Sequence, residues 1–127
     1  MGKGPTMIRL HEAVVHRLPV GVVDSLGENL GARREDMLQA IDVSLRTLAR
    51  RRKEGVLSTE ESDRAVRVAR VAALAEEVLG SREDAVEWLH QPNRSLGGRA
   101  PFEFVRTDAG ATIVTAVLGR LEHGVFG

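Results

Sequence analysis

The sequence contains no cysteine, and aromatic residues make up only 3% of its 127 residues. The lack of cysteine excludes a disulfide framework, a thiolate metal site and a thiol nucleophile, and it fits a reducing cytoplasm, where we expect the protein to act. No aromatic residue precedes Trp88, which argues against stacking on single-stranded nucleic acid. No apolar run approaches the roughly 20 residues of a membrane-spanning helix, so we expect no membrane partner.

Signals of catalysis and of metal binding are equally scarce. The four histidines are scattered, and no pair of them combines with a third ligand at a spacing typical of a metal site. The pair Glu60-Glu61 is better explained by helix capping than by acid–base chemistry, and Gly97-Gly98 is too short for a phosphate-binding loop. We therefore predict a protein that is not an enzyme and that needs no cofactor or metal.

The chain has no net charge, but this balance hides an asymmetry between its halves. Lysine and arginine together number 18, as do aspartate and glutamate. Residues 1–57 carry 10 basic and 7 acidic side chains, a net charge of +3, whereas residues 58–127 carry 8 and 11, a net charge of −3. This mild difference favours two distinct partners for the two halves.

The spacing of the apolar residues predicts an all-α fold. The expected helices cover residues 7–18, 20–30, 33–41, 45–53, 58–79, 82–89, 101–105 and 107–122, although the first also has a strand-like pattern. Residues 1–6 are expected to form a loose leader. Helix ends are marked by the capping residues Gly31, Ser44, Ser58 with Glu61, Gly80, Ser81 and Thr107. The core-facing residues of the last helix are expected to be Ile113, Val114, Val117, Leu118 and Leu121.

Residues 33–53 have the form of a helix-turn-helix motif. Asp42 occupies the turn position that glycine usually holds, and aspartate tolerates a left-handed backbone better than most other residues. Val43 is expected to fill the space between the two helices. The residues expected to hold the second helix against the first are Leu45, Leu48 and Ala49. This arrangement is typical of proteins that bind duplex DNA.

Five of the ten residues from Ser44 to Lys53 are basic. Arg46 and Thr47 fall in the first turn of the second helix, where a recognition helix meets base edges, and arginine can bond a guanine at two atoms. The basic run that follows suits phosphate contacts, which add affinity without sequence choice. The predicted DNA-binding residues are Arg33, Arg34, Ser44, Arg46, Thr47, Arg50, Arg51 and Lys53. The alternative is a solvated basic helix end, which the helix dipole also favours.

The second half of the chain contains motifs whose order and spacing are specific. They are residues 85–93 with Trp88 and Pro92-Asn93, residues 96–101 with Gly97-Gly98 and Pro101, residues 107–110, and residues 120–126. Together they resemble the toxin-binding domain of the Xre/MbcA/ParS antitoxin family. Residues 44–51 and 57–64 are similar to the Xre-like DNA-binding region of the same family. Within these motifs, Trp88 and Leu89 are expected to anchor the core rather than to contact a toxin.

The resemblance implies an antitoxin of a type II toxin–antitoxin system. Family members inhibit a RES-domain toxin, which consumes NAD, or a related ADP-ribosylating toxin, and NAD would be the substrate of that toxin. The C-terminal end is implied to reach toward the toxin active site, which makes the predicted toxin-binding residues Arg120, Glu122, His123, Gly124, Val125, Phe126 and Gly127. The resemblance also implies a homodimer within a larger toxin–antitoxin complex, bound to operator double-stranded DNA as a repressor of its own operon.

These expectations divide the chain into four parts. Residues 1–6 are the leader, 7–57 the helix-turn-helix region for DNA binding and dimerisation, 58–80 a linking helix and 81–127 the toxin-binding domain. Two other hypotheses stay open at this point. One is a stand-alone helix-turn-helix transcriptional regulator without a toxin partner, and the other is an interaction module whose helix-turn-helix no longer binds DNA.

Overall fold

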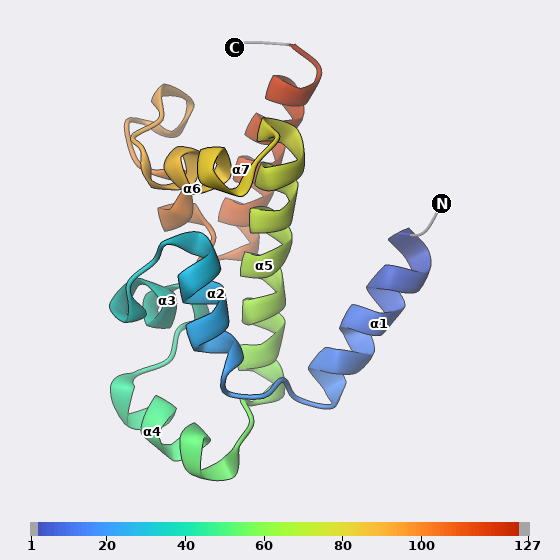
Figure 1. Ribbon diagram of the computed structural model, residues 1–127, viewed down its shortest axis with the longest axis vertical. Helices are drawn as coiled ribbons and strands as arrows, with labels where there is room; N and C mark the ends of the chain where they lie inside the picture. The colour runs from blue at the N-terminus through green and yellow to red at the C-terminus, as the bar shows by residue number, and fades with distance from the viewer. Residues whose placement is uncertain (1–2, 125–127) are drawn as a thin grey trace.

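The computed structural model describes residues 3–124 and, over that range, confirms an all-α fold (Figure 1). Its α-helices are α1 (Lys3–Val15), α2 (Val22–Leu30), α3 (Arg34–Ile41), α4 (Leu45–Glu54), α5 (Thr59–Leu79), α6 (Arg82–His90) and α7 (Asp108–Glu122). Two short 3₁₀ helices, η1 (Arg94–Leu96) and η2 (Pro101–Phe104), lie between α6 and α7. No helix in the described range is long and apolar enough to cross a membrane.

The long helix α5 is the axis around which the other helices pack (Figure 1). It contacts α1, α2 and α3 from the front half of the chain, and α6 and α7 from the back half. Its buried residues Val68, Val71 and Ala75 belong to one hydrophobic core that also takes in Ile41 from α3 and Leu118 from α7. Because both halves bury apolar surface against the same helix, they share a single core.

Side-chain caps fix where the helices begin, as predicted. The Ser58 hydroxyl accepts a hydrogen bond from the Glu61 amide at 3.1 Å, and the Glu61 carboxylate accepts one from the Ser58 amide at 2.8 Å. This reciprocal pair is the expected capping box at the start of α5. The hydroxyl of Thr107 caps α7 in the same manner by accepting from the Gly110 amide at 2.9 Å. These caps satisfy amide groups that the first helical turn leaves without intrahelical partners.

The start of the chain differs from the prediction. The helix α1 begins at Lys3, so the expectation of a loose leader is wrong for residues 3–6, and residues 1–2 lie outside the described range. The strand-like pattern of residues 7–18 does not produce a strand. The helix ends because Arg17 adopts a left-handed backbone with φ of 67°, and its side chain donates to the Leu57 carbonyl at 2.8 Å.

Three residues expected to pack inward lie at the surface instead. Leu45 is 67% exposed and Ile113 is 46% exposed, and Ala49 of α4 is also exposed. Leu45 is the first residue of α4, and this helix lies at one end of the molecule (Figure 1), where only Leu48 of its residues is buried. A periodic pattern marks which side of a helix is apolar, but it does not show how far the neighbouring helices extend to cover that side.

Candidate functional site

The turn between α3 and α4 has the geometry of a helix-turn-helix. Asp42 ends α3 in the left-handed conformation, with φ of 56° and ψ of 55°, as predicted for its position. Val43 is 6% exposed and its amide donates to the Leu38 carbonyl at 2.9 Å. The Ser44 hydroxyl then accepts from the Thr47 amide at 3.0 Å and starts α4. The turn is thus set by local backbone chemistry, and it fixes the direction of α4.

One side of α4 presents cations to solvent. Arg46, Arg50 and Lys53 are exposed, and over residues 3–124 no carboxylate forms an ion pair with any of them. Residues four positions apart in a helix lie on one side of it, so Arg46 and Arg50 point in the same direction. These three side chains are free to approach an anionic partner, which keeps them in the predicted DNA-binding set.

Arg51, by contrast, faces the body of the protein. Its guanidinium donates to both carboxylate oxygens of Glu61, at 2.7 and 3.0 Å, and it lies 3.5 Å from Glu54. The side chains of Arg51 and Glu61 are only 15% and 8% exposed. We therefore withdraw Arg51 from the predicted DNA-binding residues, because a bidentate pair this well covered holds α4 against the start of α5.

This ion pair shifts the acid–base behaviour of both partners. Burial raises the pKa of Glu61, but the hydrogen bonds from Arg51 and Ser58 and the positive charge of Arg51 outweigh it, so the pKa lies below the ordinary value. The hydrogen bond to Glu61 raises the pKa of Arg51 despite partial burial. Both shifts favour the charged pair, so Glu61 serves both the helix cap and the attachment of α4.

The remaining predicted DNA-binding residues lie at the edge of this surface. Arg33 and Arg34 are exposed; Arg33 lies 3.4 Å from Asp36 and Arg34 lies 4.0 Å from Asp24. Such surface pairs are weak enough for a phosphate to displace them. The Ser44 hydroxyl is engaged in capping and also donates to the Thr47 hydroxyl at 3.1 Å. The structure therefore places Arg46, Arg50 and Lys53 on the exposed side of α4 and Arg33 and Arg34 at the start of α3, with Arg51 turned inward.

The back half folds tightly around α6, η1 and η2. Leu89 is 1% exposed, and Trp88 is half-buried against the same core. Gly97 and Gly98 both have positive φ, at 67° and 82°, and form the turn that the sequence predicts. Gly110 packs so closely beneath the Phe104 carbonyl that a Cβ atom would collide with it. Most of the family-like motifs of this half thus hold its shape.

Several residues that join the two halves were not found by sequence reasoning. Arg67 of α5 donates to the carbonyls of Val105 and Arg106, at 2.9 and 2.6 Å, and pairs with Asp108 at 2.9 Å. The His90 ring nitrogen Nε2 lies 2.7 Å from the Leu30 carbonyl. Their partners are 38 to 60 positions away in the chain, so no local pattern could reveal these contacts.

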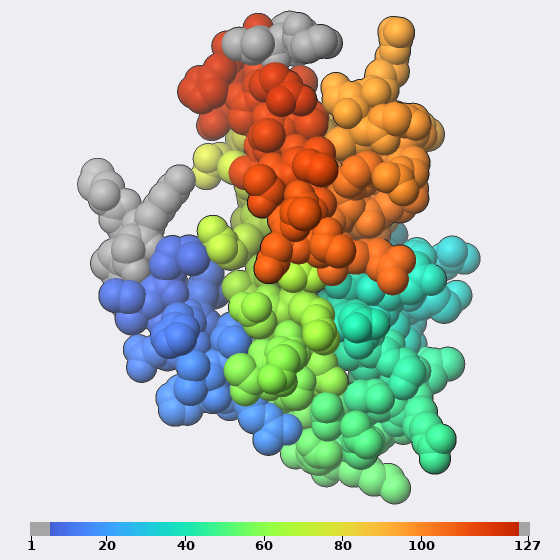
Figure 2. Space-filling view, turned by 180° about the vertical axis from the view of Figure 1, so that it is seen from behind, coloured from blue at the N-terminus to red at the C-terminus, as the bar shows by residue number. Residues whose placement is uncertain are grey.

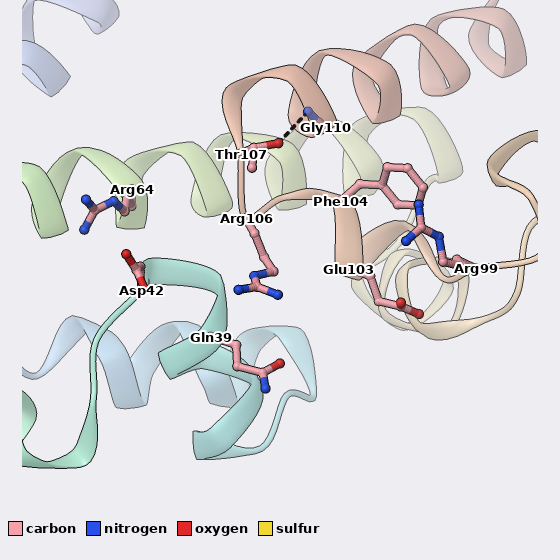
Figure 3. A pocket seen from close by; sticks show the side chains of 9 residues that line it. All are labelled: Gln39, Asp42, Arg64, Arg99, Glu103, Phe104, Arg106, Thr107 and Gly110. Carbon is pink, nitrogen blue, oxygen red and sulfur yellow. Dashed lines mark hydrogen bonds between the residues drawn. The ribbon is translucent and has the colours of Figure 1, made fainter.

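A polar cavity of about 440 Å³ lies between the α3–α4 turn and the segment that leads into α7 (Figure 3). Figure 3 shows Arg106 extending toward Gln39 across it, and the Arg99 guanidinium lies over the Phe104 ring at 4.7 Å. Its lining carries charges of both signs. Among the described residues, no group of histidine and carboxylate side chains is arranged to hold a metal ion. Charged side chains from both halves of the chain therefore line this cavity.

The described residues at the end of α7 lie at the far end of the molecule from α4 (Figure 2). Arg120, Glu122, His123 and Gly124 are all exposed at the end of α7. Gly124 has a φ of 71°, which stops the helix in the left-handed conformation. The other predicted toxin-binding residues, Val125, Phe126 and Gly127, lie outside the described residues. The two candidate surfaces are thus separated by the length of α5.

Comparison with known proteins assigns a family to each half of the chain. The antitoxin Xre-like helix-turn-helix domain matches residues 9–70, and the antitoxin Xre/MbcA/ParS C-terminal toxin-binding domain matches residues 74–124. The chain is 37% identical over 109 residues to antitoxin Xre of Yersinia enterocolitica. The aligned region covers 84% of this chain and 74% of that protein. The chain belongs to the Xre antitoxin family. It is a type II antitoxin with helix-turn-helix and toxin-binding domains.

Other relatives agree with this assignment. Antitoxin Xre of Photorhabdus laumondii is 32% identical to this Xre-family antitoxin over 85% of the chain and 74% of its own length. A chain in the crystal structure of the M. tuberculosis MbcT-MbcA toxin–antitoxin complex superposes with a TM-score of 0.63 at 32% identity. That match covers 85% of the present chain and 96% of the other. The resemblance found in the sequence is therefore confirmed, and the two matched domains meet within α5.

Proposed function

We propose that this antitoxin inhibits a RES-domain toxin, or a related ADP-ribosylating toxin, and represses its own operon by binding DNA. The observation that carries the proposal is the placement of the two matched domains, whose exposed surfaces lie at opposite ends of one core. A toxin and a duplex can therefore be held at the same time. NAD is the substrate of the toxin in this proposal, and the antitoxin itself catalyses nothing and acts in the cytoplasm.

On the toxin side, the proposed contact is the end of α7 together with the residues that follow it. The exposed side chains of Arg120, Glu122 and His123 provide polar contacts around this end. The sequence then continues with Val125 and Phe126, an apolar pair that follows a helix stop. In the proposal this segment enters the toxin active site and blocks access of NAD.

On the DNA side, the proposed contact is the exposed side of α4. Arg46 faces base edges from the first turn, and Arg50 and Lys53 contact phosphates, in keeping with the usual docking of a recognition helix. A homodimer formed through the front half would present two such helices to a palindromic operator. Self-association through the front half is supported by the exposed apolar residues of α1, which are Met7, Ile8 and Val15.

The test is co-expression with the toxin encoded by the neighbouring gene. The expected result is restored growth of the host and co-elution of the two proteins on size exclusion as one complex. Separate elution, with growth still arrested, would refute the toxin-inhibition proposal. A promoter duplex from the same operon is then titrated with antitoxin alone and with the complex. Specific binding without any toxin partner would instead favour a stand-alone regulator.

A further inference from the structure

Leu45 is the most exposed large apolar residue among those that the structure describes. Its side chain is 67% exposed, although leucine gains free energy when it is removed from water. It is the first residue of α4, directly after the Ser44 cap. The fold does not bury this side chain: α4 packs on the core through Leu48 and through the Arg51–Glu61 ion pair.

The surroundings of Leu45 combine apolar and cationic side chains in one small area. Ala49 is also exposed and lies one turn further along the same side of α4. Arg46 and Arg50 form a second, parallel row next to this apolar row. The outward side of the helix therefore carries two apolar residues flanked by two arginines that have no ion-pair partner between residues 3 and 124.

This combination fits the major groove of duplex DNA better than a protein surface. A protein partner that covered Leu45 would also have to supply carboxylates for Arg46 and Arg50, whereas a duplex supplies phosphates and guanine edges to both. The major groove also presents one apolar group to an approaching helix, the 5-methyl group of thymine. The first turn of a recognition helix is the part that meets base edges.

We propose that Leu45 is a specificity-determining residue that contacts the 5-methyl group of a thymine in the operator. The inference rests on the proposed DNA binding and adds to it the identity of one base. Arg46 and the phosphate contacts supply most of the affinity, and Leu45 selects thymine over cytosine at its position. In this reading Leu45 is exposed in the free protein because its partner is the duplex.

The test begins with a randomised duplex library and the full-length antitoxin, from which bound duplexes are recovered and sequenced. Each thymine of the recovered site is then replaced in turn by deoxyuridine, which lacks the methyl group but keeps the same hydrogen-bonding edge. Wild-type protein should bind about fourfold more weakly at one position in each half-site, the change expected when one buried methyl-sized group is lost. The Leu45→Ala variant should bind the thymine and deoxyuridine duplexes equally well at that position.

Two further variants separate base contact from folding. Leu45→Met keeps an apolar side chain of similar size and should retain the preference for thymine. Ile113→Ala removes an exposed apolar residue from α7, outside the helix-turn-helix, and should leave the preference unchanged. Melting temperatures of all variants should match the wild type, because both positions are exposed.

The outcomes distinguish this inference from the function on which it rests. Recovery of no duplex by the wild-type protein contradicts the DNA-binding proposal, and the role of Leu45 fails with it. In a second outcome a site is recovered, but replacement of thymine by deoxyuridine weakens binding of Leu45→Ala as much as it weakens binding of the wild type. This result overturns the role of Leu45 and leaves the DNA-binding proposal intact. A thymine preference that vanishes only in the alanine variant supports the inference.

Discussion

The two ends of this antitoxin, α4 and α7, present opposite kinds of surface on the same core. The sequence of α4 carries arginine at four of its ten positions, and Arg46, Arg50 and Lys53 are exposed without an ion-pair partner in the described chain. The helix α7 has no charged residue between Asp108 and Arg120, and its exposed end carries one charge of each sign, on Arg120 and Glu122. One surface suits a polyanion and the other suits a protein, so salt should affect the two binding reactions very differently.

The ends are also attached to the core in different ways. The helix α4 is held by its buried Leu48 and by the covered ion pair from Arg51 to Glu61, with a surface ion pair from Arg52 to Asp24. The start of α7 is held mainly by hydrogen bonds from Arg67 to backbone carbonyls, together with the ion pair to Asp108. Protonation of Glu61 should therefore loosen the α4 end more than the α7 end, because this carboxylate is central to the attachment of α4.

The largest expected effect tests whether the two ends share one core. Met37 in α3 of the front half is 1% exposed, and Leu118 in α7 of the back half is 0% exposed. Met37→Ala and Leu118→Ala should each lower the free energy of unfolding by about 2–5 kcal/mol, because each leaves a cavity in the core. Both should shift a single urea transition, followed by circular dichroism and by Trp88 fluorescence. Two separate transitions in either variant would show that the halves fold independently.

A smaller expected effect tests whether the exposed arginines of α4 bind DNA. Replacement of both Arg46 and Arg50 by alanine should weaken operator binding by about 2 kcal/mol or more, which is roughly thirtyfold. The slope of binding affinity against salt concentration should become shallower, since fewer counterions are released. The measurement is a fluorescence-anisotropy titration at several salt concentrations.

The same double variant has an internal control in toxin binding. Its affinity for the toxin should equal that of the wild type, because α4 lies at the opposite end of the molecule. Unchanged operator affinity would mean that the cations of α4 are only a solvated surface. A loss of both activities would mean that the two ends are not independent.

Sequence reasoning located this helix-turn-helix well because its signals are local. The left-handed turn at Asp42 and the Ser44 cap depend on a few adjacent residues, and the structure confirms both. The toxin-binding motifs were found by family resemblance, and the structure shows that Gly97, Gly98 and Gly110 mainly shape the backbone there.

The failures share a different physical cause. Leu45 and Ile113 have the apolar character of core residues, but no neighbouring element extends over them. Arg51 looks equivalent to Arg50 in the sequence, yet successive residues of a helix point in different directions, and Arg51 faces Glu61. Burial of this kind depends on tertiary packing, which a single sequence does not encode in any local pattern.

At the α7 end, deletion of Val125 to Gly127 should weaken toxin inhibition by about tenfold or more. This estimate corresponds to the loss of one buried aromatic side chain, about 1.5–3 kcal/mol. Operator binding by the truncated protein should stay at the wild-type level. Residual toxin activity is measured as NAD consumption at increasing antitoxin concentration. Full neutralisation by the truncated chain would place the inhibitory contact elsewhere in the toxin-binding domain.

The smallest expected effect concerns acid and the attachment of α4. The pKa of Glu61 is below its ordinary value of 4.5 in the folded protein, so its contribution to stability is complete above about pH 5 and is lost as the pH falls through the lowered pKa. Glu61→Gln keeps an oxygen that can accept from the Ser58 amide but removes the charge that binds Arg51. The variant should therefore be less stable than the wild type at neutral pH.

The pH profile of this variant decides whether the ion pair or the cap matters more. The difference between the urea midpoints of the two proteins reports the contribution of the Glu61 charge. That difference should shrink as the pH falls from 6 to 3, because protonation removes the same charge from the wild type that glutamine removes from the variant. Arg50→Ala, which changes the neighbouring exposed arginine, should follow the wild-type profile. Parallel profiles for Glu61→Gln and wild type would mean that the carboxylate supports α5 through its cap and contributes little to the attachment of α4.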